Sequence, residues 1–256
     1  MSDWNPALYS KFEDERTRPA TELLARVPVS APAQVVDLGC GPGNSTELLV
    51  HRFAAAHIIG TDTSPAMLAA ARQRLPAITF ELSDISSWAP QVPVDLLYAN
   101  ASLHWVSDHA SLFPRLLSVL APGGVLAVQM PDNIDEPSHV LMRETAADAR
   151  FAPSIDPSGG PREFLLAPDQ YYDLLAQHAQ VDVWRTTYYH RMEGATAIVQ
   201  WLRTTGLKPF LDALRADLQS AFLAEYEQRI AAAYPPRSDG RCLLAFPRLF
   251  IVARRR

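Results

Sequence analysis

The chain has 256 residues, of which 48% are hydrophobic and 20% are charged, and its formal net charge is −5. A chain of this length and apolar content can bury a substantial core, which excludes a disordered protein. Lys and Arg form a run only at Arg254–Arg256, whereas a nucleic-acid site needs a clustered basic face, so a nucleic-acid partner is not expected.

Short apolar runs alternate with amphipathic helical stretches in the first half of the chain. The expected strands are residues 35–39, 57–62, 78–82, 94–100 and 125–130, and the expected helices are 44–53, 65–75 and 112–120. Asn44 followed by Glu47 predicts a capping box, and Ser64 before Pro65 predicts an N-cap. A Pro-Gly-Gly turn at 122–124 is expected to end the third helix. This alternation predicts a parallel sheet covered on both faces.

The regular alternation of strands and helices ends after residue 130. Helices are expected at 137–150, 169–178, 195–205 and 211–234, and strands at 181–189 and 243–253. The fold class predicted is α/β: one Rossmann-like domain over residues 1–256, with a seven-stranded, mostly parallel sheet and helices on both faces. Its core is expected at about 20–130 and 180–256, and inserted helical lid segments at about 131–178 and 194–235.

The cysteines and the lengths of the apolar runs narrow the class of protein further. Cys40 and Cys242 lie far apart without CxxC spacing, so we expect neither disulfides nor a metal site. No apolar run approaches the ~18–20 residues of a membrane span, and the first residues lack the pattern of a signal peptide. The expectation is a soluble, cytoplasmic protein, with its oligomeric state left open.

The strongest functional signal is the segment Val36–Asn44, VDLGCGPGN, where a strand leads into a glycine-rich turn and a helix. Glycines let the backbone approach a ligand closely, and a helix start offers N–H groups. The glycines at 39, 41 and 43 follow a GxGxG spacing, whereas the dinucleotide fingerprint is GxGxxG. We therefore favour a cradle for an amino-acid carboxylate and a nucleoside over a pyrophosphate site, with a purely structural turn as the alternative.

Acidic residues follow the next two strands. Asp62 ends the second strand, where a carboxylate can accept both ribose hydroxyls. Asp84 follows the third strand, where it is expected to meet an adenine amino group while Ile85 covers the ring; an ordinary turn aspartate is the alternative. Ser102 and Trp105 follow the fourth strand, whose loop opens on the same edge of the sheet; Trp105 would either wall the adenine or anchor this loop in the core.

These motifs together resemble the class I S-adenosylmethionine-dependent methyltransferases. The resemblance is closer to the trans-aconitate methyltransferase family, and it rests on residues 1–6, 23–28, 99–105, 128–133, 184–190 and 244–254. It implies transfer of a methyl group to one carboxylate of trans-aconitate, giving a monomethyl ester and S-adenosyl-L-homocysteine. A carboxylate is ionised near pH 7, so no general base is required.

The resemblance and the motifs give two sets of candidate residues. For S-adenosyl-L-methionine they are Asp37, Gly39, Cys40, Gly41, Asn44, Asp62, Thr63, Ser64, Met67, Asp84, Ile85, Asn100, Ser102 and Trp105. A small-molecule tricarboxylate needs cations and hydrogen-bond donors, and the candidates for these are Tyr9, Arg16, Arg18, His104, Tyr188, Tyr189, His190 and Arg248. The alternative for each arginine is a surface residue, and for His104 it is a hydrogen-bonded polar residue of a loop. Strand alternation directs only one of the two adjacent tyrosines toward the site.

Three other functions compete with this interpretation. One is a methyltransferase that acts on a different acid, a hydroxyl or an amine, an alternative that the glycine motif does not exclude. A nicotinamide-dependent oxidoreductase is disfavoured by the GxGxG spacing and by the lack of a Tyr-x-x-x-Lys pair. A non-catalytic protein that senses the cofactor is the third, because cofactor binding does not establish turnover.

Overall fold

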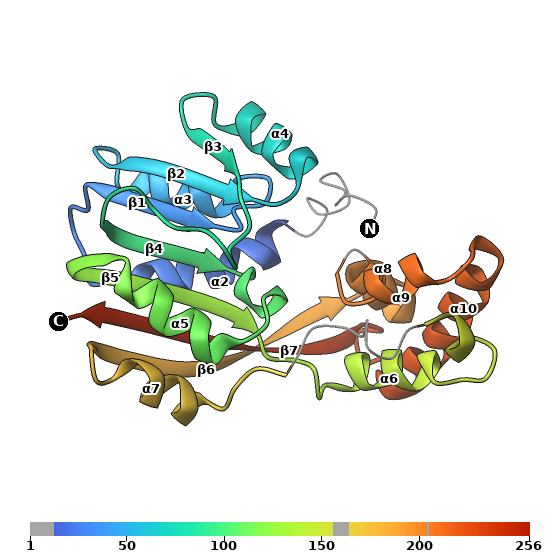
Figure 1. Cartoon of the computed structure of the whole chain (residues 1–256). Coiled ribbons are helices and arrows are strands. Elements are labelled where there is room, and N and C mark those ends of the chain that lie inside the picture. Colours follow the sequence, from blue (N-terminus) through green and yellow to red (C-terminus); the bar gives the residue numbers. More distant parts are fainter. Residues whose placement is uncertain (1–12, 156–163, 204) are drawn as a thin grey trace. The chain divides into compact units, whose positions relative to one another are not determined.

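The computed structural model describes residues 13–155, 164–203 and 205–256, with side chains from residue 17 onward. Seven strands form one sheet in the order β3-β2-β1-β4-β5-β7-β6 (Figure 1). The strands are β1 Gln34–Leu38, β2 His57–Asp62, β3 Thr79–Leu82, β4 Val94–Asn100, β5 Leu120–Pro131, β6 Ala179–Met192 and β7 Cys242–Arg255. β1 to β5 pair in parallel, and β7 runs antiparallel to β5. The predicted α/β class and the mostly parallel sheet are confirmed.

The structure describes nine α-helices and two 3-10 turns in residues 13–155, 164–203 and 205–256. They are α2 Glu13–Ala25, α3 Asn44–Arg52, α4 Pro65–Arg74, α5 His109–Ser118, α6 Pro137–Ala146, α7 Pro168–Leu175, α8 Gly194–Arg203, α9 Lys208–Ala213 and α10 Ala216–Ala233, with 3-10 turns η1 Leu103–Trp105 and η2 Ala152–Ser154. No helix within the described ranges has both the length and the hydropathy needed to cross a bilayer. Cys40 and Cys242 are buried free thiols.

The chain separates into two compact units. Among the described residues, the sheet unit comprises 13–131, 164–186 and 248–256, and the helical unit comprises 132–155, 187–203 and 205–247. Helix α7, placed in an inserted segment by the sequence analysis, belongs to the sheet unit, because Tyr171 and Leu175 are buried in its core cluster. That the helical unit acts as a lid stays a prediction.

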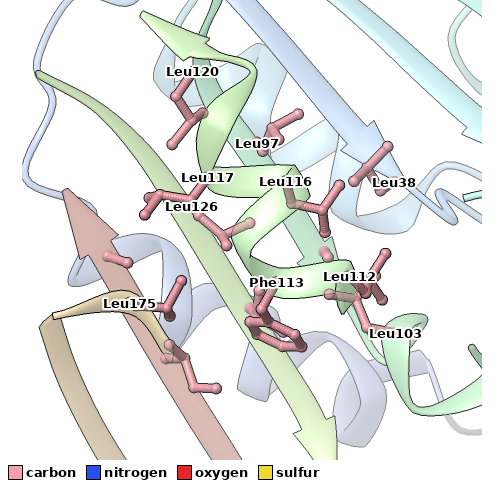
Figure 2. Packing of buried hydrophobic residues seen from close by; sticks show 14 of the residues in the cluster. Leu38, Leu97, Leu103, Leu112, Phe113, Leu116, Leu117, Leu120, Leu126 and Leu175 are labelled. Atoms are coloured by element: carbon pink, nitrogen blue, oxygen red, sulfur yellow. The ribbon is translucent and has the colours of Figure 1, made fainter. Parts of the chain in front are cut away.

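The core of the sheet unit is centred on α5. Its residues Leu112, Phe113, Leu116 and Leu117 lie against the sheet, and all are buried (Figure 2). Leu103 of η1 belongs to the same cluster, so the apolar core also fixes the loop that follows β4. Burying a side chain of this size contributes roughly 1.5–3 kcal/mol, which makes this loop part of the stable framework.

The helical unit has its own core and its own polar contacts. Helix α10 packs on α6 and α8 and buries Phe222 and Ile230. Tyr226 of α10 donates its hydroxyl to the Ser138 carbonyl at 2.8 Å, and the Ser138 N–H donates to the Tyr234 hydroxyl at 3.0 Å. Burial raises the pKa of Tyr226, so it remains a neutral donor there.

Several predicted boundaries agree with the structure. The strands at 57–62 and 94–100 are confirmed residue for residue. Ser64 is the N-cap of α4, where its hydroxyl accepts the Met67 N–H at 3.2 Å, and Pro65 is the first helical residue. These features depend only on local sequence, which explains why they could be recognised without the fold.

Other local predictions are wrong. The predicted capping box does not form: the N-cap of α3 is Gly43, in the left-handed region and without a side chain, Asn44 is the first helical residue, and Glu47 pairs with Arg74 at 3.0 Å. The glycine pair at 123–124 does not end a helix; it lies in an irregular stretch of β5, where the register with β4 shifts. The long helix expected at 211–234 is interrupted after Ala213 and resumes at Ala216.

The start of α5 also differs from its prediction. The helix begins at His109, three residues before the expected start, and accommodates Pro114 in its interior. Its N-cap, Asp108, has φ +54 and accepts the Ser111 N–H at 3.2 Å. An aspartate tolerates the left-handed region better than most residues and also caps a helix, so one residue satisfies both requirements.

We expect Asp108→Ala to lower the unfolding free energy by about 1–2 kcal/mol, because alanine loses the cap and is strained at positive φ. Asp108→Gly is expected to cost less, because glycine adopts this conformation freely. Denaturant unfolding of both variants measures the difference, with Asp108→Asn as the control that retains both properties. A glycine variant less stable than the alanine variant would contradict this account.

Candidate functional site

The loop between β1 and α3 is held by hydrogen bonds that its N–H groups donate to β2. The N–H groups of Gly39 and Cys40 both donate to the Thr61 carbonyl at 2.8 Å. The Gly41 N–H donates to Oδ2 of Asp62 at 2.9 Å. Gly39, Gly41 and Gly43 have φ of +72°, +54° and +92°, so the predicted GxGxG spacing places a glycine at each left-handed position of the turn.

A second strand approaches this loop from the other side. A Cβ on Gly39 would lie 2.4 Å from Cβ of Ser102, which follows β4. The Ser102 hydroxyl donates to the Leu38 carbonyl at 2.6 Å and joins the two loops. Because β1 lies between β2 and β4, these loops meet at the point where the strand order reverses, and open α/β sheets bind their ligands there.

Asp37 lies buried beneath the loop. Its side chain is 0% exposed, and Oδ2 accepts the hydroxyls of Ser45 and Thr46, each at 2.7 Å. Burial raises the pKa of Asp37 to about 6, while the two hydroxyls act to lower it and the nearby Asp62 acts to raise it. Oδ1 has no hydrogen-bond partner in the described part of the chain. A buried carboxylate with one oxygen available fits a ligand group that is positively charged.

Asp62 has a structural role that the sequence analysis did not anticipate. Besides the Gly41 N–H, its carboxylate accepts the Ser64 N–H on Oδ1 at 2.8 Å. Each carboxylate oxygen has two lone pairs, so the ribose role remains compatible with both contacts. Of the neighbouring candidates, Thr63 is exposed, whereas Ser64 and Met67 are joined by the α4 cap.

The loop after β3 brings Ile85 to the glycine turn. Its Cδ1 lies 3.6 Å from the position of a Cβ on Gly39. Asp84 is exposed, and its Oδ1 accepts the Ser86 hydroxyl at 2.7 Å and N–H at 2.8 Å, bonds that lower its pKa. It therefore forms an ordinary Asx turn, and its adenine role stays a prediction. Arg115, which the sequence analysis missed, fixes this loop by donating to the Ile85 carbonyl at 2.6 Å.

The loop after β4 has an unusual backbone. Ala101 adopts φ +54°, which costs roughly 1–2 kcal/mol in a residue with a Cβ, and its N–H donates to the Gln129 carbonyl at 2.9 Å. Strained residues of this kind cluster at functional sites. Beyond it, His104 is buried and Trp105 is 40% exposed, with their ring centroids 4.8 Å apart.

A buried histidine supports this loop. Nε2 of His109 contacts the Leu103 carbonyl at 3.0 Å, and Nδ1 contacts the Tyr171 hydroxyl. A carbonyl only accepts, so Nε2 bears a proton and donates it to Leu103. A cavity of about 150 Å³ adjoins the loop, lined by His104, Val106, Asp108, His109, Ala110, Phe164 and Leu166. No sequence motif marks His109, which belongs to no spacing pattern.

The candidates for the acid substrate have different surroundings in the sheet unit. Arg248 is buried, 3% exposed, and its Nη1 donates to Oε1 of Gln129 at 3.1 Å. Arg18 is exposed on α2 and pairs with Glu22 at 2.9 Å, an arrangement typical of a solvated helix surface. Tyr9 and the side chain of Arg16 lie outside the described residues.

The remaining candidates lie on β6 in the helical unit. Tyr188 is buried and Tyr189 is 65% exposed, so the two point to opposite faces of the strand. The His190 ring lies 4.6 Å from that of Trp201 and 5.7 Å from that of Phe246. Their substrate roles stay predictions.

The glycine loop, the acid after β2 and the strand order together define a Rossmann-like methyltransferase. A family profile described as a methyltransferase domain matches residues 35–124. The fold resembles an S-adenosylmethionine-dependent methyltransferase from Mesorhizobium loti, with a TM-score of 0.53 and 23% identity over 95% of this chain and 100% of that one.

Curated relatives specify the family. The chain is 63% identical to trans-aconitate 2-methyltransferase of Variovorax paradoxus (strain S110), over 100% of both chains. It is 61% identical to trans-aconitate 2-methyltransferase of Methylobacterium radiotolerans, over 100% of this chain and 99% of that one. The chain belongs to the trans-aconitate 2-methyltransferase family.

Gly39→Ala is expected to lower the unfolding free energy by about 3 kcal/mol or more, since it adds backbone strain to the overlap with Ser102. Gly41→Ala is the matched control: its φ is also positive, but its Cβ enters open space, so about 1–2 kcal/mol is expected. The overlap predicts that Gly39→Ala costs less in a Ser102→Gly background. Equal costs in both backgrounds, measured by denaturant unfolding, would exclude the overlap as the cause.

The raised pKa of Asp37 makes a prediction about pH. In the folded chain this carboxyl ionises near pH 6, against a reference value of 3.8, so it loses stabilising free energy as the pH rises from 4 through 6. Relative to the wild type, Asp37→Asn should therefore become more stable over this range by up to about 3 kcal/mol. Unfolding free energies of both proteins between pH 4.5 and 7.5 test this; a constant difference would contradict it.

Proposed function

We propose that this chain transfers the methyl group of S-adenosyl-L-methionine to one carboxylate of trans-aconitate, giving its monomethyl ester and S-adenosyl-L-homocysteine. The observation that supports this most strongly is the 63% identity, over the entire chain, with trans-aconitate 2-methyltransferase of Variovorax paradoxus. The likeness therefore includes the helical unit as well as the glycine loop. We also propose that the protein acts in the cytoplasm on a free small molecule and not on nucleic acid.

The cofactor would be held along the carboxyl edge of β1, β2 and β4. Oδ1 of Asp37 suits the positively charged amino-acid part, and Asp62 would accept the ribose hydroxyls. Ile85 would cover the adenine, with Asp84 near its amino group. Asn100 ends β4, and Ser102 and Trp105 follow it; all three would lie near the same ligand. When bound, the cofactor supplies an electrophilic methyl group on a sulfonium.

The protein's part in the reaction is to position and desolvate the acid. A carboxylate with a pKa around 4 is already the nucleophile at pH 7, so no residue needs to remove a proton. Alignment of the attacking oxygen and removal of water lower the barrier. The arginine at position 248 would contribute the positive charge that a trianion needs, with His104 as a further proposed contact in the same unit.

The test is methyl transfer from labelled S-adenosylmethionine to trans-aconitate, with cis-aconitate, citrate and isocitrate assayed in parallel. We expect a clear preference for trans-aconitate and a base-labile ester as the product. Calorimetry with S-adenosylmethionine is the control for an intact cofactor site. A protein that binds the cofactor but methylates none of these acids would contradict the proposed substrate, and a base-stable product would contradict carboxyl transfer.

A further inference from the structure

Two buried polar side chains lie together at the carboxyl end of β5. Gln129 stands opposite Asn100 of β4 in register, and Arg248 of β7 stands opposite Pro131. Residues 129 and 131 share one face of β5, which places Gln129 and Arg248 on the same side of the sheet. Their hydrogen bond, Nη1 to Oε1 at 3.1 Å, agrees with this placement.

This face is not the one covered by α5. The neighbours of Gln129 along the strand, Val128 and Met130, belong to the α5 core cluster, so Gln129 points to the opposite face. Helix α2 packs on β5 there. Gln129 is 0% exposed and Arg248 is 3% exposed. A primary amide at such a position costs free energy unless its polar atoms find partners.

The arginine fixes which way the amide faces. A guanidinium only donates hydrogen bonds, so the Gln129 atom that meets Arg248 must be the carbonyl oxygen Oε1. Nε2, with its two N–H donors, is thereby directed away from that contact. Nε2 is buried and has no hydrogen-bond partner within residues 17–155, 164–203 and 205–256. Leaving such a donor buried without a hydrogen bond is unfavourable, which points to a ligand as its partner.

The chemistry of the pair identifies the ligand group. The amide N–H donors and the guanidinium offer only donors and one permanent positive charge, a set that suits a carboxylate. Gln129 lies two strands from the glycine loop of β1, and neighbouring strands are about 4.8 Å apart. This spacing places it beyond the cofactor candidates of β1 and β2, with Asn100 of β4 between them, and favours the acid substrate.

We propose that Gln129, acting with Arg248, binds a carboxylate of trans-aconitate that is not methylated, and so selects for polycarboxylates. The inference rests on the proposed function. Strong, charge-assisted hydrogen bonds stabilise a carboxylate anion and make it a poorer nucleophile, so such a pair is suited to a carboxylate that is held and not attacked. Oε1 of Gln129 orients the guanidinium, and Nε2 adds donors of its own.

Gln129→Glu is the most informative variant. It retains the shape of the side chain and an acceptor for Arg248, but replaces the two N–H donors with a negative charge. We expect the KM for trans-aconitate to rise about tenfold or more, with little change in the Kd for S-adenosylmethionine measured by calorimetry. Gln129→Met, which lacks charge, should also raise the KM. Gln180→Glu, an exposed position on β6, is the control for added charge.

Three dicarboxylates sharpen the test, because each lacks one carboxylate of trans-aconitate: cis-glutaconate, itaconate and mesaconate. For the analogue without the carboxylate that Gln129 binds, the Gln129→Glu penalty should disappear, while it persists for the others. A merely structural role would lower activity equally on all three. Equal penalties, or an effect on S-adenosylmethionine binding alone, would overturn the inference.

The same data separate this inference from the proposed function. A wild-type protein without activity on trans-aconitate would overturn the proposed function, and the inference with it. An active wild-type protein whose KM is unchanged by Gln129→Glu would overturn the inference alone. Thermal unfolding of each variant with and without S-adenosylmethionine gives a readout independent of turnover, and a ligand-induced shift equal to that of the wild type is expected.

Discussion

The loop after β1 is fixed from both sides by the strands that flank it, and the rest of the site depends on this constraint. The Thr61 carbonyl and the Asp62 carboxylate take its N–H groups from the β2 side. Ser102 approaches from the β4 side so closely that Gly39 has no room for a side chain. A loop held in this way keeps its shape before any ligand arrives, so binding need not supply the free energy of ordering it.

The same constraint explains why a carboxylate is buried at Asp37. Burial raises its pKa, and the hydroxyls of Ser45 and Thr46 offset only part of that cost. The cost is consistent with a site completed by a cationic ligand, because a nearby positive charge stabilises the ionised form. The buried carboxylate therefore lowers the free energy of unfolding but suits ligand binding, as is common for polar residues buried at functional sites.

Much of the framework could be predicted from the sequence because it depends on local patterns. Apolar runs located the strands, and the GxGxG spacing located the turn that needs positive φ. The predicted capping box is wrong because α3 is capped one residue earlier, at Gly43, and because Glu47 has a tertiary partner, Arg74, that local sequence does not reveal. His109 and Gln129 were missed for a similar reason: each acts through a residue at least six positions away, and their importance appears only when the strands are in register.

Gln129 and Arg248, at the carboxyl end of β5, show how a buried charge can contribute to binding. An arginine withdrawn from water loses hydration, and a substrate carboxylate loses it as well, so their attraction gives net binding only if the geometry is set beforehand. Gln129 sets that geometry through Oε1 without adding a negative charge that would neutralise the arginine. An aspartate or glutamate in its place would hold the guanidinium more tightly, but it would repel the acid. A neutral acceptor is therefore the residue type that orients Arg248 without adding a negative charge of its own.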